Sequence, residues 1–292
     1  MTDWKYYNHA LIPTSAPHEE VDMTDIENGT AWKKYPSALF ARWTSDFDCG
    51  VETVWWYVIK DTPFDVNALK AKRRYEIKKG LTNFSVKKLD ASECVSWAED
   101  LYRVTIEAYS AWPEKYRPSV AHDSFVRSVE EWTDRTVYAA FSAQDGSLCG
   151  YAFLKDQGKC LDFQVMRTVP ACERLAINAA MVAAILEDQK EFLEQGGYIC
   201  DGSRSVRHET AFQEYLEKYF GFRKAYCQLH LRYHKKVGWL IKLLYPFRGL
   251  LKKMDGIGIV NSLNAILTME ELVRLQTKEN TQTKSTKEKE ST

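Results

Sequence analysis

The sequence predicts a fold of the α/β (α+β) class, with a mixed, mostly antiparallel sheet flanked by helices and a C-terminal helical appendage. Three apolar segments, 136–143, 148–155 and 160–167, are joined by short turns and predict an antiparallel meander. The next segment, 171–194, is apolar almost all round in its first half, which predicts a helix buried against that sheet. Residues 196–234 then indicate a short strand, a polar loop, a helix and a long final strand.

The composition is typical of a soluble globular protein. The 292 residues suffice for a sizeable core, with 45% apolar and 27% charged residues. Forty basic residues balance forty acidic ones, so the chain as a whole has no preference for polyanions. The seven cysteines are odd in number and form no CxxC pair, which favours reduced thiols over disulfides or a zinc site. With no signal-peptide pattern and no apolar run of membrane-spanning length, we expect a cytoplasmic protein.

Residues 1–80 are expected to form an N-terminal extension, made of a β-hairpin and a basic helix. Aromatic and β-branched residues on either side of a turn at Asp48 to Gly50 predict the hairpin between residues 37 and 61. Asp65 then caps a predicted helix that begins at Val66 and is stopped by Gly80. The helix is either an ordinary solvated face or a patch that faces phosphate; its basic residues are Lys70, Lys72, Arg73, Arg74, Lys78 and Lys79.

Residues 81–234 are expected to form the main domain. A strand over 83–89 is followed by Asp90 and Glu93, which form a capping box for a helix to about Tyr109. A second helix is predicted over 123–132, ahead of the meander. After the meander and the buried helix, a short strand ends in the polar loop 201–205. Ligands bind at such strand-to-helix loops in α/β proteins, so this loop is the first candidate for a site.

The C-terminal part changes in character. From Arg232 to Met254 there are seven Lys or Arg residues and no acidic ones, interleaved with aromatic and aliphatic residues. This pattern suits a basic amphipathic segment, assigned to residues 235–276, that lies on an anionic membrane surface. The alternative is an ordinary helical appendage that packs on the core. Residues 277–292 are rich in Lys, Glu and Thr, which predicts a disordered tail.

The order of these elements resembles the GNAT acyltransferase fold over about half of the chain, from Asn83 to His234. The step Tyr219-Phe220-Gly221 between the last helix and the last strand is similar to the one seen in that fold. The basic segment 73–81 resembles the segment before the second acyltransferase domain of FemABX-type aminoacyltransferases, which use aminoacyl-tRNA. The resemblance implies an N-acyltransferase that moves an acyl group from acyl-CoA or aminoacyl-tRNA to an amino group, without a metal.

One departure from the GNAT pattern concerns the donor-binding turn. In GNAT enzymes that use acetyl-CoA, glycines in this turn let backbone N–H groups close on the pyrophosphate. The corresponding stretch here, 167–176, contains no glycine. This departure disfavours coenzyme A bound in the usual way and leaves the acyl-transfer class in place.

The candidate catalytic residues are Asp201, His208 and Tyr226. Asp201 can act as a base or orient the acceptor amine, His208 is a second candidate base, and Tyr226 can protonate the leaving group. Each also has a structural explanation: a loop or cap carboxylate, an exposed histidine at a helix start, and a packed strand tyrosine. Cys172, near a helix N-terminus, can have a lowered thiol pKa and carry an acyl group.

The candidate donor-binding residues are arginines. Their guanidinium groups suit phosphate or carboxylate, although surface arginines often have no such role. Histidines add no metal site, because His230 and His234 lie roughly 13 Å apart along one strand. The donor-binding candidates are Arg73, Arg74, Arg167, Arg174 and Arg204.

The analogy also suggests the acceptor and the place of action. We expect a small-molecule or lipid-linked amine, such as a cell-envelope or polysaccharide precursor, with tRNA as donor and a peripheral contact at the inner face of the membrane. The competing hypothesis is a non-catalytic GNAT-like module that binds a partner or the membrane surface. The expected domain ranges are 1–80, 81–234, 235–276 and 277–292.

Overall fold

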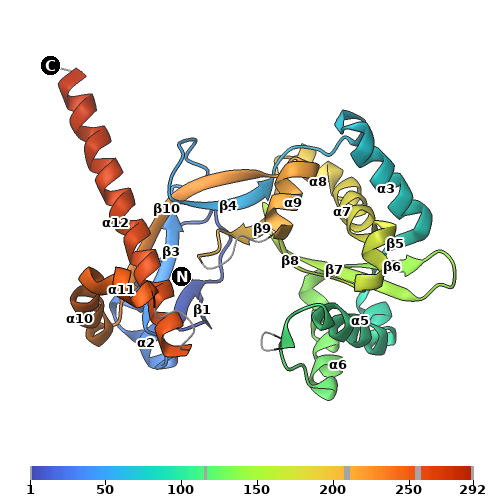
Figure 1. Cartoon of the computed structure of the whole chain (residues 1–292), viewed down its shortest axis with the longest axis horizontal. Helices are drawn as coiled ribbons and strands as arrows, with labels where there is room; N and C mark the ends of the chain where they lie inside the picture. Colours follow the sequence, from blue (N-terminus) through green and yellow to red (C-terminus); the bar gives the residue numbers. More distant parts are fainter. Residues whose placement is uncertain (1, 115–116, 207–210, 254–257, 291–292) are drawn as a thin grey trace. The chain divides into compact units, whose positions relative to one another are not determined.

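The computed structural model describes residues 2–114, 117–206, 211–253 and 258–290. The chain forms two compact units, and each is built from separate stretches of sequence (Figure 1). We call them the terminal unit (1–57, 203–210 and 224–292) and the central unit (58–202 and 211–223). These bounds do not coincide with the ranges expected from the sequence, because the chain passes between the units more than once. The expected domain division stays a prediction.

The central unit contains a five-stranded sheet in the order β9-β8-β7-β6-β5. Strands β5 to β8 pair antiparallel, which confirms the predicted meander, and β9 joins parallel to β8. The turns of the meander place Gly146 and Gly158 at positive φ, where a side chain is disfavoured. The strands are β5 (Phe84–Leu89), β6 (Arg135–Ser142), β7 (Leu148–Gln157), β8 (Cys160–Thr168) and β9 (Tyr198–Ser203).

Helices cover both faces of this sheet (Figure 1). Helices α3 (Ala71–Asn83) and α7 (Ile177–Asp188) pack together on one face, and α8 (Lys190–Glu194) follows α7. The other face carries α4 (Ala91–Ser96), α5 (Ala98–Ser110), α6 (His122–Glu130) and the 3-10 turn η3 (Trp132–Asp134). Helix α9 (Ala211–Phe220) completes the unit.

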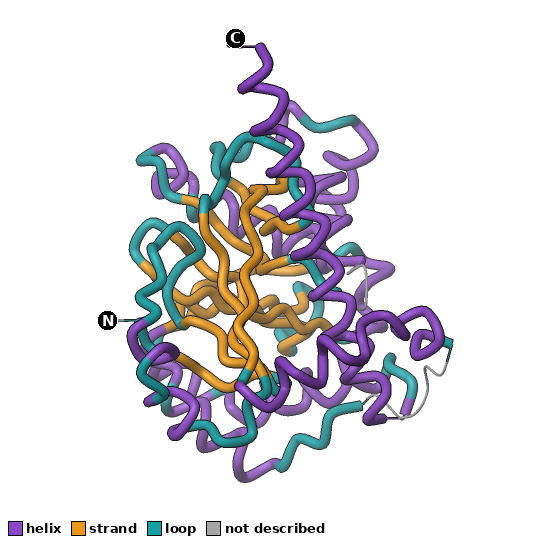
Figure 2. The backbone as a smooth tube through the Cα atoms, turned by 90° about the vertical axis from the view of Figure 1, so that its left-hand side faces the viewer, coloured by secondary structure: helices purple, strands orange, loops and turns teal. Residues whose placement is uncertain are grey.

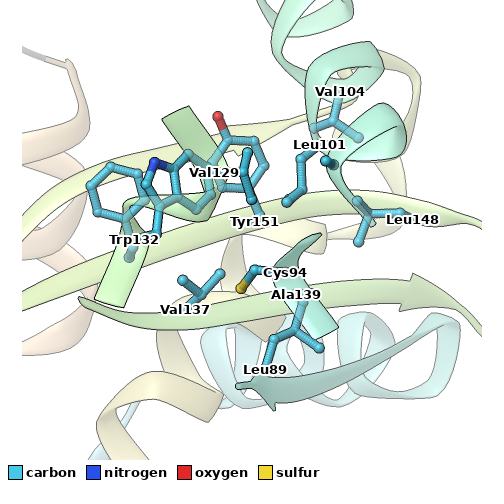
Figure 3. Packing of buried hydrophobic residues seen from close by; sticks show 12 residues of the cluster. Leu89, Cys94, Leu101, Val104, Val129, Trp132, Val137, Ala139, Leu148 and Tyr151 are labelled. Carbon is cyan, nitrogen blue, oxygen red and sulfur yellow. The ribbon is translucent and has the colours of Figure 1, made fainter. Parts of the chain in front are cut away.

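The core beneath α4 to α6 follows from the alternation of the strands (Figure 3). Trp132 belongs to it, with its ring centroid 5.2 Å from that of Phe153. The buried hydroxyl groups of Thr105 and Tyr151 form a hydrogen bond with an oxygen–oxygen distance of 2.7 Å, so both have a partner in the core. Asp90 and Glu93 form the predicted capping box at the start of α4.

Gly80 does not stop the basic helix as expected. Asp65 caps only the short 3-10 turn η1 (Val66–Ala68), and α3 begins afterwards and continues through Gly80. A Cβ at Gly80 would lie 2.9 Å from the Cβ of Ala180 and closer still to the carbonyl oxygen of Ala176. The glycine therefore serves the close approach of α3 to α7 rather than a helix end.

The terminal unit has its own strands, and they correct the predicted hairpin. Strands β3 and β4 form where the hairpin was expected, but β10 pairs antiparallel with β3 and lies between the two in the strand order. On its other side β3 pairs parallel with β2, which pairs antiparallel with β1. The strands are β1 (Trp4–Tyr7), β2 (Ala10–Pro13), β3 (Phe40–Ser45), β4 (Trp55–Lys60) and β10 (Arg223–Tyr233).

Side-chain alternation gives the strands of this unit two apolar faces. Leu11 and Ala41 pack with the cluster of α1 and α2, while Ala10 and Phe40 pack with α10 and α12. Figure 2 shows the long helix α12 running beside the strands. The helices are α1 (Thr24–Glu27), α2 (Thr30–Lys34), α10 (Lys235–Leu244), η5 (Tyr245–Phe247), α11 (Arg248–Lys252) and α12 (Gly258–Glu290).

Two further observations bear on the predictions. Helix α12 includes the described part of the tail that was expected to be disordered, 277–290. Among the described residues, none of the helices combines the length and the apolar character that crossing a bilayer requires.

Candidate active site where strands β8 and β9 part

The parallel pair β8 and β9 is the unusual feature of the central sheet. Within the described residues the two strands pair only through Cys160, Leu161 and Asp162 of β8, which face Tyr198, Ile199 and Cys200 of β9. Strand β8 continues for six more residues, to Thr168, and there it pairs with β7 alone. The edge of β8 that follows Asp162 thus presents backbone N–H and C=O groups to the space next to Asp201. Such groups can stabilise a developing oxyanion.

A β-bulge coincides with the point of separation. The β7–β8 register shifts between Phe153 and Leu154, which face Val165 and Phe163, so Gln164 is an extra residue in β8. A bulge bends its strand and often re-aims side chains next to an active site. Here it follows the last parallel pair directly, and it gives a physical reason why the two strands diverge.

Asp201 lies on β9 immediately after the last parallel pair. The strand extends to Ser203, so Asp201 belongs to the strand end and not to the loop that was expected there. Burial raises the pKa of the Asp201 carboxyl to about 8; a hydrogen bond with the Gln213 side chain opposes the rise, and the charge of Asp162 adds to it. A carboxyl with this pKa is largely protonated at neutral pH and matches the proton affinity of an amine.

The polar groups around Asp201 come from three elements. From α9, Gln213 donates its Nε2 to the Asp201 carbonyl oxygen at 3.2 Å. On β8, the bulged Gln164 donates its Nε2 to Asp162 Oδ2 at 2.8 Å. Gly202 has a φ of +92°, and a Cβ there would meet nothing within 4 Å, so the backbone beside Asp201 is open. The arrangement places the Asp201 carboxyl among polar side chains of β8 and α9.

The turn that follows β8 is closed by its own hydrogen bonds. It forms the 3-10 helix η4 (Pro170–Leu175), in which Cys172 N–H donates to Val169 O and Ala176 N–H to Glu173 O. Ala176 then takes a left-handed φ of 65° before α7 begins. In a glycine-rich phosphate cradle such amides would point at the ligand. The turn without glycine thus has at least two backbone N–H groups that already donate hydrogen bonds within the chain and do not point at a ligand.

The arginines at this turn have different surroundings. Arg167, on β8, is partly buried and donates its Nη2 to the Tyr109 hydroxyl at 3.0 Å. Arg174 is exposed, and its carbonyl oxygen accepts a 2.7 Å hydrogen bond from Lys79 Nζ of α3. Arg167 thus precedes η4 and Arg174 lies within it, and their role in donor binding stays a prediction.

The expected lowered pKa of the Cys172 thiol is wrong. Burial raises this pKa to about 11, and the neighbouring Cys149 adds to the rise. Cys172 also lies in η4, ahead of the first residue of α7, so it does not sit at that helix N-terminus. A thiol in this state is a poor acyl carrier.

The two arginines of α3 contact protein groups. Arg73 forms an ion pair with Glu76, and its guanidinium lies 3.6 Å from the ring centroid of Tyr219, with 11% of the side chain exposed. Arg74 is exposed and donates its Nη1 to the carbonyl oxygens of Leu69 and Asn67. These contacts give both residues a structural part in joining α3 to its surroundings, while phosphate binding by them stays a prediction.

The remaining candidates belong to the terminal unit, apart from His208, which lies outside the described residues. Arg204 and Tyr226 meet at Trp56. The Arg204 guanidinium lies 4.4 Å from the Trp56 ring centroid and donates to the Val54 carbonyl oxygen at 2.6 Å, and the Tyr226 ring centroid lies 6.1 Å from that of Trp56. Lys224 Nζ is also 4.4 Å from the Trp56 ring.

Sequence reasoning missed Asp162, Gln164, Gln213 and Trp56. A signal for the first two was present, because Asp162 and Gln164 are polar residues that alternate with the apolar Leu161 and Phe163 in a strand. Trp56 follows the buried Trp55, so alternation along β4 assigns it to the opposite face. Gln213 carries no such signal, since its importance depends on how α9 packs. No group of three or more metal-ligating side chains occurs among the described residues.

No protein-family model matches the sequence, and no curated protein matches it. The C-terminal domain of a putative lysylphosphatidylglycerol synthetase from Agrobacterium fabrum is similar in structure, with 12% identity and a TM-score of 0.50 over 82% of this chain and 83% of that chain. The L-PGS structure from Bacillus licheniformis has 12% identity and a TM-score of 0.48 over 80% of each chain. FemX has 10% identity and a TM-score of 0.49 over 80% of this chain and 82% of that chain. With the strand pairing described above, the first likeness shows that this chain has a GNAT-like fold, in which a mostly antiparallel sheet is flanked by helices.

Proposed function

We propose that the protein is an acyltransferase that moves an acyl group from an activated ester or thioester to an amino group. The observation that carries the proposal is the parting of β8 and β9 at Asp201, where burial raises the pKa of the carboxyl to about 8. Transfer to an amine needs a group that removes a proton from an ammonium and donors for the oxyanion. Asp201 is the group that removes the proton, and backbone N–H groups at the free edge of β8 are the donors for the oxyanion.

The reaction proceeds by attack of the amine on the acyl carbonyl carbon. In the fraction of molecules in which Asp201 is ionised, its carboxylate accepts a proton from the acceptor ammonium, and the amine nitrogen forms a bond to the carbonyl carbon. Backbone N–H groups of β8 beyond Asp162 stabilise the oxyanion of the tetrahedral intermediate. The intermediate collapses by breaking the bond to the leaving oxygen or sulfur, which takes the second proton of the attacking nitrogen, and Asp201 releases the first proton to solvent.

Among donors, the turn η4 favours an aminoacyl ester, such as aminoacyl-tRNA, over acyl-CoA. The backbone N–H groups of Cys172 and Ala176 already donate hydrogen bonds at η4. The stretch 167–176 also has no glycine that would let a pyrophosphate approach the backbone. The similar structure from Agrobacterium fabrum is named for an aminoacylated lipid, which points in the same direction. We propose an amine on a cell-envelope or polysaccharide precursor as the acceptor, with acyl-CoA as the second candidate donor.

The first test separates the donors. The purified protein is titrated with acetyl-CoA, with charged bulk tRNA and with the same tRNA after deacylation. Binding that requires the aminoacyl ester supports the proposed donor, and binding of acetyl-CoA instead makes the protein an acetyltransferase. If the protein binds none of these, the non-catalytic module is favoured.

The second test addresses the base. Transfer from the donor that binds is followed as loss of its acyl group in the presence of a mixture of amino sugars and aminolipids. Asp201→Asn is expected to lower the rate about 10²-fold to 10⁴-fold, whereas Asp156→Asn, at an exposed position near the end of β7, leaves it unchanged. Donor binding should persist in both variants. An Asp201→Asn variant with full activity would contradict the proposed base.

A further inference from the structure

Helix α10 has two apolar faces, and only one of them is covered. Val237 and Ile241 pack in the core of the terminal unit, and Ile241 is only 1% exposed. At 100° per residue, Trp239 and Leu243 lie on the other side of the helix. No element among the described residues covers that side, since Trp239 is 70% exposed and Leu243 is 51% exposed.

The uncovered face continues through η5 into α11. We call it the apolar patch; it consists of Trp239, Leu240, Leu243, Phe247 and Leu250. Phe247 follows Leu243 by four residues and is 57% exposed, and Leu250 is 63% exposed. Soluble monomers rarely expose adjoining large apolar side chains in this way, and such patches mark contact surfaces.

Positive charge surrounds the apolar patch. Residues 235–253 contain six Lys or Arg residues and no Asp or Glu. The side chains of Lys242, Lys252 and Lys253 are exposed beside the patch, and Lys235 is exposed at the start of α10. Among these four lysines, Lys252 forms an ion pair with Glu271 of α12, in which Lys252 Nζ lies 3.2 Å from Glu271 Oε2.

A cavity of about 700 Å³ adjoins the same segment. Tyr245 and Arg248 belong to both the segment and the cavity wall, and α12 contributes Lys278 and Arg274, of which Arg274 pairs with Glu270 at 2.8 Å. Glu271, the acidic residue among the described residues that line the cavity, pairs with Arg248 at 3.1 Å. The cavity thus extends the cationic surface inward next to the apolar patch.

We propose that the apolar patch and its flanking lysines dock on the surface of an anionic lipid bilayer. Aromatic and leucine side chains insert at the boundary of headgroups and acyl chains, while lysines at that depth contact lipid phosphates. A second copy of the chain is disfavoured as the occupant, because it would bring the same positive charge against this surface. A nucleic acid would satisfy the lysines and leave five exposed apolar side chains without a role.

The test uses the full chain and sedimentation with two kinds of vesicle. One is phosphatidylcholine alone, and the other contains roughly one-third phosphatidylglycerol. The wild type is expected to bind the anionic vesicles about tenfold more tightly or better. The variant Trp239→Ala/Phe247→Ala and the variant Lys242→Glu should each bind them roughly tenfold less tightly.

Matched controls change exposed residues elsewhere in the terminal unit. Val51→Ser is the apolar control and Lys33→Glu the charge control, and both should bind as the wild type does. Vesicles should also shift tryptophan emission to the blue, and Trp239→Phe should remove most of this shift while binding persists. Equal urea midpoints for all variants would show that folding is unchanged.

Two results would overturn the proposal. One is failure of the wild type to bind anionic vesicles. The other is binding that Lys242→Glu weakens but the double aromatic variant does not, and that single-stranded poly(U) competes away, which would assign the surface to nucleic acid.

Discussion

Helices α7 and α10 are similar in composition and opposite in environment. Apolar residues surround α7 almost completely, and α10 combines six apolar residues with three lysines. Eight of the twelve residues of α7 are buried, because α7 packs on the central sheet and against α3 beside it. In α10 Ile241 is buried while Trp239, Leu240 and Leu243 are exposed. The apolar residues of a helix therefore do not by themselves show whether it is buried. Whether its apolar surface becomes core or contact surface depends on the elements that pack against it.

The largest effect is expected from a cavity in α7. Ile185 is 1% exposed, and Ile185→Ala should lower the free energy of unfolding by about 3 kcal/mol. Urea denaturation followed by far-UV circular dichroism measures this loss. A loss below about 1 kcal/mol would mean that α7 is not packed on the sheet and against α3.

The next effect concerns the helix that covers α7. Gly80→Ala forces a Cβ against the carbonyl oxygen of Ala176 and the side chain of Ala180, which should cost about 2 kcal/mol. Gly249→Ala in α11 is the control, because a Cβ there meets nothing within 4 Å, and it should be neutral or stabilising by up to about 1 kcal/mol. Equal urea midpoints for the two variants would rule out close packing of α3 on α7.

Burial also raises the pKa of an ionisable group, the carboxyl of Asp201. The folded carboxyl keeps its proton up to a pH of about 8, whereas in the unfolded chain it ionises near pH 4. Between these values the folded state binds more protons, so the free energy of unfolding falls as pH rises, by about 1 kcal/mol per unit. Asp201→Asn should remove this slope.

The measurement is a series of urea denaturations between about pH 5.5 and 8.5 for the wild type and Asp201→Asn. The difference between the two curves should favour the asparagine variant increasingly at high pH. A constant difference across the series would show that the carboxyl is ionised throughout and that its pKa is not raised.

The smallest effect is expected in α10. Leu243→Ala shortens a 51% exposed side chain, so the free energy of unfolding in buffer should change by less than about 0.5 kcal/mol. The same substitution should weaken binding to anionic vesicles. If Leu243→Ala destabilises the protein as much as Ile185→Ala does, the apolar patch is covered in solution and the contrast between α7 and α10 disappears.

Local sequence signals predicted the elements whose partners lie nearby. The meander from β6 to β8 was predictable because its strands alternate and its turns contain Gly146 and Gly158. The capping box of Asp90 and Glu93 was predictable because both partners lie within one turn. Asp201 was predicted as the first loop residue after a short strand, and the structure extends the strand through it to the point where β8 and β9 part.

Features that depend on distant residues were not predictable. The expected hairpin failed because β10, about 180 residues later in the chain, pairs with β3. Gly80 has the sequence signature of a helix end, and only its distance to Ala176 explains why the helix continues. The raised pKa of Asp201 and the lowered one expected of Cys172 both depend on burial, which the residue types alone do not reveal.

The route of the chain between the two units has a consequence for its synthesis. Residues 1–57 leave the ribosome first, yet β3 needs β10, and the strands need α10 and α12 from the last quarter of the chain. Once residue 202 has left the ribosome, residues 211–223 are the one part of the central unit still to be synthesised. The central unit can therefore begin to fold while β1 to β3 are still without β10. During that interval the apolar strands of the terminal unit are open to a chaperone, and truncation before β10 would leave them without a fold of their own.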